Sequence, residues 1–113
     1  MKIVLCCQGG FSTTMLMDSM KRTVRDSKKL DEADFTFKAI PADQLPAEVD
    51  DTDVVILGPQ VAHREGSIRE VLAPHNIPYA IVDKDTYAQM DGATVLKMAL
   101  VARKKADLAA QGK

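Results

Sequence analysis

The sequence lacks several features that would point to particular classes of protein. It has no apolar run of membrane-spanning length, and the apolar run near its start, Ile3 to Cys6, is far too short for a signal peptide. The formal net charge is only −1, so no general attraction to nucleic acid or to an anionic membrane is expected. These absences predict a cytoplasmic protein that binds no nucleic acid.

Cysteine is also scarce, and the two cysteines present, Cys6 and Cys7, are neighbours in the sequence. Side chains alternate between the two faces of a strand, so a structural disulfide between them is not expected. One thiol should point into the core and the other toward the loop that follows. There is no Cys-x-x-Cys and no Cys/His cluster, so the sequence predicts no zinc site, and nothing in it indicates a cofactor.

A third group of residues, Asp50, Asp51 and Asp53, resembles a cation site only superficially. No glycine or glutamate follows at the spacing of a calcium-binding loop. These aspartates therefore favour a solvated turn before a strand, and no metal site is predicted.

The chain has the length and composition of one globular domain. Its 113 residues are 46% hydrophobic and 27% charged, which allows a substantial core. We expect one domain over 1–113, with its core at about 1–105, and we expect a monomer. Predicted strands cover Ile3 to Cys6, Phe35 to Ile40, Asp53 to Leu57 and Ile77 to Val82; predicted helices cover Ser12 to about Leu30, Val61 to Leu72 and Gly92 to about Ala110, and Asp83 to Asp91 is a mixed loop or short helix.

Alternating strands and helices predict an α/β fold in one three-layer domain. The sheet should be parallel and four-stranded, with helices on both faces and right-handed crossovers. The flavodoxin-like strand order 2-1-3-4, a fold similar to low-molecular-weight tyrosine phosphatase, places the first strand beside the third. The loop after Cys7 and the loop at Gly58-Pro59-Gln60 should then meet at one crevice.

The stretch after the first strand carries the candidate chemistry. Cys7 is followed by a glycine-containing loop and by Ser12, Thr13 and Thr14, which are residue types that begin helices. Backbone N–H groups and the helix dipole favour negative charge at such a junction, so a thiolate or a phosphate is stabilised there. Phosphate-ester hydrolysis, phosphoryl relay and redox chemistry are all compatible with a thiol in this position.

The missing arginine separates these possibilities. Low-molecular-weight tyrosine phosphatases and related arsenate reductases need an arginine six positions after the nucleophile, but Thr13 stands there, and no arginine precedes Arg22. A redox thiol needs a resolving cysteine, and Cys6 is badly placed for that role. A loop of amides and hydroxyls suits a carrier that must not hydrolyse its phosphoryl group. A phosphatase or arsenate reductase-like enzyme is the alternative, and a non-enzymatic receiver or ligand-binding module is a third possibility.

Three motifs together resemble one protein family. Cys7-Gln8-Gly9-Gly10-Phe11-Ser12-Thr13 is similar to the Cys-x-x-Gly-x-Ser-Thr loop of enzyme IIB components of the bacterial sugar phosphotransferase system, lactose/cellobiose (diacetylchitobiose) class. The strand ending in Leu57-Gly58-Pro59-Gln60 and the helix entry at Asp91-Gly92 are also similar to that class. The resemblance covers about residues 1–105. It departs at Phe11, where the class often has methionine.

The resemblance implies a phosphotransferase that works through phosphocysteine. A phosphohistidine on a IIA protein or domain would phosphorylate Cys7, which would pass the group to a sugar taken up through the membrane component IIC. The sugar would be a β-linked disaccharide such as cellobiose, lactose or diacetylchitobiose, and IIC would recruit the protein to the inner face of the membrane. The family's phosphate-binding loop maps onto Gln8, Gly9, Gly10, Phe11, Ser12 and Thr13. Only from Cys7, not from Cys6, do Gly10 and the Ser-Thr pair fall in register.

Other candidate residues carry weaker signals. His63 and His75 are expected to be exposed histidines at loops or helix ends. The acid-bearing segment with Asp83, Asp85 and Tyr87 is similar to a phosphatase loop, but without the arginine it is expected only to shape the surface. A ring of apolar side chains around the site is our hypothesis for a docking surface, and its members are Phe11, Met15, Met17, Val61 and Ala62.

Overall fold

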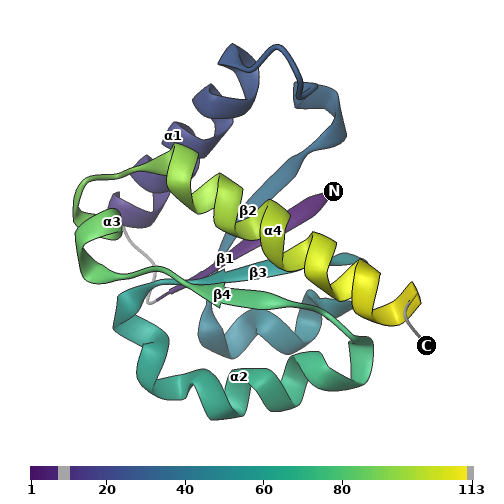
Figure 1. Cartoon of the computed structure of the whole chain (residues 1–113). Helices are drawn as coiled ribbons and strands as arrows, with labels where there is room; N and C mark the ends of the chain where they lie inside the picture. The colour runs from purple at the N-terminus through teal and green to yellow at the C-terminus, as the bar shows by residue number, and fades with distance from the viewer. Residues whose placement is uncertain (8–10, 112–113) are drawn as a thin grey trace.

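Four parallel strands form one sheet in the order β2-β1-β3-β4, which confirms the predicted fold class (Figure 1). The computed structural model describes the backbone of residues 1–7 and 11–111, and the side chains of residues 1–6 and 14–109. The strands are β1 (Lys2–Cys7), β2 (Thr36–Pro41), β3 (Val54–Leu57) and β4 (Tyr79–Ile81). β1 pairs on both sides, so the strand that ends at Cys7 lies inside the sheet.

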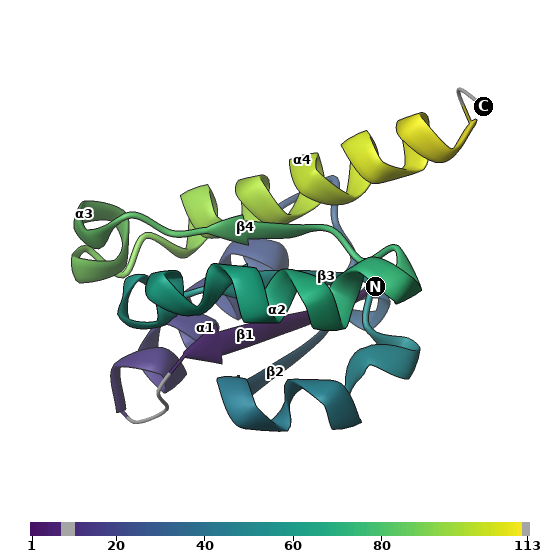
Figure 2. The same ribbon diagram turned by 90° about the horizontal axis from the view of Figure 1, so that it is seen from below.

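Helices cover both faces of the sheet. Helices α1 (Phe11–Asp26) and α4 (Gly92–Gln111) lie above it in Figure 1, and α2 (Glu65–Leu72) lies below it; Figure 2 shows the α2 side. The short helix α3 (Lys84–Ala88) lies between β4 and α4 in the chain. The remaining helical segments are 3₁₀ turns: η1 (Glu32–Asp34), η2 (Ala42–Ala47), η3 (Val49–Asp51), η4 (Pro59–Arg64) and η5 (Ala73–His75).

The sheet divides the core into two clusters because alternate residues of β1 face opposite sides. Ile3 and Leu5 pack with the apolar stripe of α1, and Val4 and Cys6 pack with residues of α2 and η2. The α1 stripe follows the predicted helical spacing, and all three of its residues are fully buried: Leu16, Met20 and Val24. Cys6 is 0% exposed, which confirms that one of the two thiols points into the core.

Two predicted helices were too long. α1 ends at Asp26 rather than near Leu30. The residues directly after Asp26 are polar, and Leu30 packs against the core from outside the helix. The segment predicted as one helix from Val61 to Leu72 is a 3₁₀ turn followed by α2. Its first bond runs from the Val61 N–H to the Gly58 carbonyl (3.1 Å), three residues back, so the chain turns more tightly there than an α-helix.

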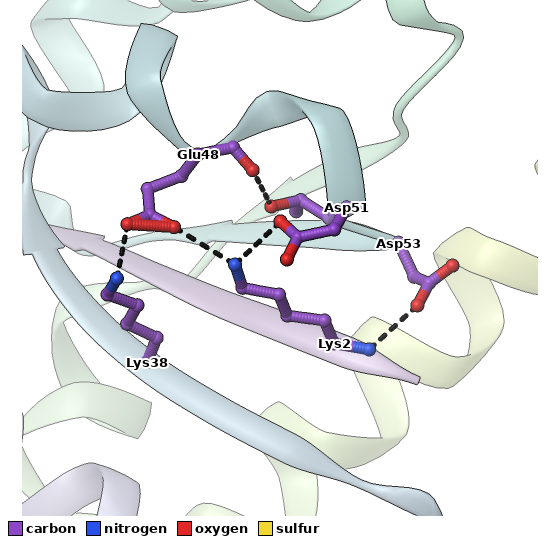
Figure 3. Close-up of polar contacts among 6 residues, drawn as sticks. Lys2, Lys38, Glu48, Asp51 and Asp53 are labelled. Carbon is purple, nitrogen blue, oxygen red and sulfur yellow. Dashed lines mark hydrogen bonds and ion pairs between the residues drawn. The ribbon is translucent and has the colours of Figure 1, made fainter.

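Ion pairs hold the amino end of β1 (Figure 3). The Lys2 Nζ donates to Glu48 Oε2 (2.9 Å) and Asp51 Oδ1 (2.7 Å), and the Lys2 N–H donates to Asp53 Oδ2 (2.7 Å). Lys38 also pairs with Glu48. The hydrogen bond to Asp51 raises the pKa of Lys2, and the bond from Lys38 lowers the pKa of Glu48.

The aspartates before β3 were predicted to form a solvated turn, and for two of them this was wrong. Asp51 and Asp53 do not stand in a merely solvated turn, because both bind Lys2. Within the described residues, no three His, Cys, Asp or Glu side chains are grouped so that they could hold a metal ion.

Candidate functional site

The candidate site lies at the carboxyl edge of β1. Cys7 is the last residue of that strand and pairs with Pro41 of β2, and α1 begins at Phe11. Phe11, Ser12 and Thr13 are placed by their backbone as the first turn of α1, whereas Gln8, Gly9 and Gly10 lie outside the described residues. The backbone therefore puts Cys7 at the end of a strand, and a helix begins four positions later in the sequence, at Phe11.

The end of β3 lies directly beside the end of β1. The Gly58 N–H donates to the Cys6 carbonyl oxygen at 3.0 Å, and Pro59 then opens the turn η4. This contact places Gly58 beside Cys6, whereas the predicted meeting with the loop after Cys7 falls on residues outside those that the structure describes. The sheet order explains it, because β1 and β3 are adjacent and parallel, so their carboxyl ends meet at one edge.

Two cavities lie at this edge and share the buried side chain of Tyr87. A small one of about 10 Å³ lies under the strand ends, and a larger one of about 290 Å³ lies beside them. Lys84 lines the larger cavity and has no ion-pair partner within the described part of the chain. The small cavity is lined by Leu5, Cys6, Leu16, Ile56, Gly58, Val82 and Tyr87, and the larger by Pro59, Gln60, Lys84, Tyr87 and Ala88.

Asp83 acts as a helix cap at this edge and is poorly suited to be a general acid. Its carboxylate accepts from the Thr86 N–H (3.2 Å) and from the Thr86 hydroxyl (2.5 Å) at the start of α3. The hydrogen bond from the Thr86 hydroxyl is the main reason that the pKa of Asp83 is lowered. A general acid at neutral pH needs a raised pKa, so Asp83 does not supply the protonated carboxyl that phosphate-ester hydrolysis would use.

A second aspartate caps α4 in the same way. The Asp91 carboxylate accepts from the Thr94 N–H (3.1 Å) and the Thr94 hydroxyl (2.7 Å), and the bond from that hydroxyl is the main cause of its lowered pKa. Both aspartates have an ordinary pKa of 3.8 when unfolded. Because folding lowers that pKa, their contribution is fully present above about pH 4 and is lost as the pH falls through the lowered value.

We expect the thermal midpoint to fall as the pH drops below about 4, and the double variant Asp83→Asn/Asp91→Asn to lose less over that range. Asparagine still caps a helix but does not titrate. Calorimetry between about pH 7 and pH 2 measures both curves. Identical acid slopes for the two proteins would show that these caps do not titrate with folding.

Ser19 is a polar residue on α1 whose contacts could not be read from the sequence. Its hydroxyl lies between α1 and the corner that begins α4, where it donates to the Met90 carbonyl (2.9 Å) and accepts from the Gly92 N–H (3.1 Å). Only the glycine at the helix entry signalled a close approach, and it did not identify the partner. The close approach is real, because a Cβ on Gly92 would lie 2.5 Å from backbone atoms of Ser19 and Met20.

The weaker candidates have mixed outcomes. His63 and His75 are exposed, as predicted, in η4 and η5. Val61 was wrongly placed in the apolar ring, because it is 1% exposed and packs in the core on the α2 side. Met15 is 44% exposed on α1, whereas Met17 is half-buried against the core and Ala62 is half-buried in η4. The side chain of Phe11 is not among those described.

Comparison with known proteins assigns the family. Residues 2–98 match the model of the lactose/cellobiose-specific IIB subunit of the phosphotransferase system, PTS, so the chain belongs to that family. In the parts of the chain that the structure describes, no helix is both long enough and apolar enough to span a membrane.

Individual relatives agree with the family assignment. The chain is 27% identical over 99 residues to the oligo-beta-mannoside-specific EIIB component of Bacillus subtilis (88% of this chain, 92% of the relative). It is 30% identical to the cellobiose-specific EIIB component of Lactococcus lactis (86% and 91%). The solution structure of a cellobiose-specific IIB component from Borrelia burgdorferi superposes with a TM-score of 0.75 at 33% identity, covering 93% of both chains.

A more distant structure shares the fold alone. The lactose-specific IIB component domain from Streptococcus pneumoniae has a TM-score of 0.64 at 14% identity, over 90% of this chain and 96% of that domain.

Proposed function

We propose that the protein is a cytoplasmic phosphoryl carrier in which Cys7 holds the phosphoryl group. A phosphohistidine on a IIA protein or domain donates the group, and a sugar brought by the membrane component IIC accepts it. The observation that carries this proposal is the position of Cys7, at the end of an inner strand and four positions before the start of α1, in a chain of the PTS IIB family. We propose that it acts as a monomer and that IIC recruits it to the inner face of the membrane.

The chemistry consists of two displacements at phosphorus. In the first, the Cys7 thiolate attacks, the S–P bond forms, the P–N bond of phosphohistidine breaks, and the imidazole leaves with the electron pair. In the second, a sugar hydroxyl oxygen attacks, the O–P bond forms, the S–P bond breaks, and the hydroxyl proton passes to a base as the thiolate is released. The N–H groups in the first turn of an α-helix have no carbonyl partner within the helix, so the first turn of α1 favours the negative charge that is present throughout.

Two features support a carrier rather than a hydrolase. No arginine stands between Cys7 and Thr13 to clamp the phosphoryl oxygens, as the sequence shows. Asp83, the acid nearest in sequence to the end of β4, has its carboxylate engaged by Thr86 and its pKa lowered. A phosphocysteine beside such groups lacks both the electrophilic clamp and the general acid that rapid hydrolysis needs.

The sugar is proposed only at the level of a class. Relatives carry the names oligo-beta-mannoside-specific, cellobiose-specific and galactose-specific. We propose a β-linked disaccharide such as cellobiose, lactose or diacetylchitobiose.

Phosphate mapping tests the proposal. The protein is incubated with phosphoenolpyruvate, the general phosphotransferase enzymes and a lactose/cellobiose-class IIA, and modified peptides are located by mass spectrometry under conditions that preserve S–P bonds. We expect phosphate on Cys7 only when IIA is present. Phosphate on His63 or His75 instead would overturn the proposed carrier residue. Turnover of an aryl phosphate without any partner would support the phosphatase alternative.

A further inference from the structure

We propose that Ser19 is a positioning residue for the Cys7 site. Its hydroxyl ties α1 to the corner formed by Met90, Asp91 and Gly92, called the α4 corner below, and so sets where α1 begins relative to Cys7. This inference rests on the proposed function, because it concerns the residue that would carry the phosphoryl group. Its hydrogen bonds join residues 71 and 73 positions apart in the chain.

The contact between α1 and the α4 corner leaves little freedom for sliding. A Cβ on Gly92 would lie 2.5 Å from the Met20 nitrogen, the Ser19 carbonyl carbon and the Ser19 Oγ, so the two backbones are in close contact around the Ser19 hydroxyl. Met90 has a φ of 51°, in the left-handed region that few non-glycine residues adopt. Figure 1 shows the start of α4 running beside α1. A backbone contact of this kind has no flexible group that could absorb a displacement of the helix.

The α4 corner is also linked to the residues that precede Cys7. The Met90 N–H donates to the Tyr87 carbonyl (3.0 Å), and the Asp91 N–H donates to the Thr86 carbonyl (3.2 Å). The Tyr87 side chain is buried and lines the small cavity together with Cys6 and other core residues. The α4 corner therefore contacts α1 through Ser19. Through Tyr87 it is also linked to the residues at the end of β1.

A displacement at Ser19 reaches the site because a helix moves as a stiff rod. Ser19 lies eight residues after Phe11, or about 12 Å along the axis at about 1.5 Å per residue. The end of β1 at Cys7 and the start of α1 at Phe11 are only four positions apart in the chain, so a shift of α1 along its axis moves its first turn relative to the strand end. Unpaired N–H groups of the first turn would then move relative to the sulfur, and a displacement of about 1 Å can cost about 100-fold in rate.

Thr23 provides a matched control on the same helix. Its hydroxyl donates to the Ser19 carbonyl (3.0 Å), so this bond stays within α1 and makes no link to the α4 corner. Ser19→Ala and Thr23→Ala each remove one hydroxyl from α1, but only Ser19→Ala removes hydrogen bonds between α1 and the α4 corner.

The test measures the Cys7 thiol directly and needs no partner. The rate of Cys7 alkylation by iodoacetamide is followed against pH by peptide mass spectrometry in the wild type and both variants. For Ser19→Ala we expect the profile to move to higher pH, with a fall of about 3- to 10-fold at neutral pH, since the thiolate fraction falls about tenfold per pKa unit. Phosphoryl transfer from IIA should fall about tenfold. Thr23→Ala should match the wild type in both assays.

The outcomes separate this inference from the carrier proposal. If Ser19→Ala lowers the melting temperature but leaves the alkylation profile unchanged, Ser19 is only a packing residue and the inference is overturned. If the wild type accepts no phosphate from IIA, the proposed function fails, while the alkylation profiles still decide whether Ser19 positions the thiol. An equal shift in Thr23→Ala would also overturn the inference, because that variant keeps the tie to α4.

Discussion

A Cys7→Ser variant is expected to lose sugar phosphorylation, with a fall of at least about 10⁴-fold. A serine hydroxyl is not ionised near neutral pH and has no adjacent general base assigned to it, so it cannot replace a thiolate as the nucleophile. Phosphoenolpyruvate-dependent formation of sugar phosphate, with IIA and IIC supplied, measures the loss.

The neighbouring Cys6→Ser variant is the matched control. It should still transfer phosphate, because Cys6 faces the core on the α2 side and is 0% exposed. A hydroxyl in that apolar cluster should cost about 1–3 kcal/mol in the free energy of unfolding, measured by urea denaturation. If Cys6→Ser were the inactive variant and Cys7→Ser the active one, the assignment of the carrier thiol would be wrong.

Gly92→Ala is expected to lower the free energy of unfolding, although it adds only one methyl group. A methyl group at this position would lie 2.5 Å from the backbone of α1, so α1 and α4 must separate. Such overpacking costs about 1–3 kcal/mol, and more where the obstacle is backbone. The free energy of unfolding in urea gives the effect directly.

Gly66 supplies the control for the same substitution. It lies within α2, and a Cβ there would meet nothing within 4 Å. Gly66→Ala should therefore raise the free energy of unfolding by about 0.4–1 kcal/mol, because alanine loses less conformational freedom on folding. Equal denaturation midpoints for the two alanine variants would show that α1 and α4 accommodate the methyl group.

Local pattern was enough to predict most of the architecture. The apolar run at Ile3 to Cys6 predicted an inner strand, and the spacing of Leu16, Met20 and Val24 predicted the buried face of α1. The alternation of strands and helices predicted a parallel sheet, and the flavodoxin-like order assumed for it correctly brought Gly58 beside Cys6. These features depend on residues that are close in the sequence or on general rules of chain connection.

Features that depend on contacts between distant residues could not be predicted in this way. The pairing of Lys2 with Glu48 and Asp51 joins residues more than 40 positions apart, and no sequence pattern marks it. The link from Ser19 to the α4 corner is hidden for the same reason. The apolar periodicity after Gly58 also could not distinguish a 3₁₀ turn from the first turns of an α-helix, so Val61 was taken for a surface residue.

The opposite orientation of neighbouring side chains on β1 also affects how the protein would meet an oxidant. Cys6 is directed into the core, and these are the only two cysteines in the chain. A sulfenic acid formed on Cys7 would therefore have no second thiol of the same molecule with which to condense. Reduction of this sulfenic acid would need a thiol from another molecule, such as glutathione. The oxidised protein would then form a mixed disulfide with that thiol rather than an internal disulfide.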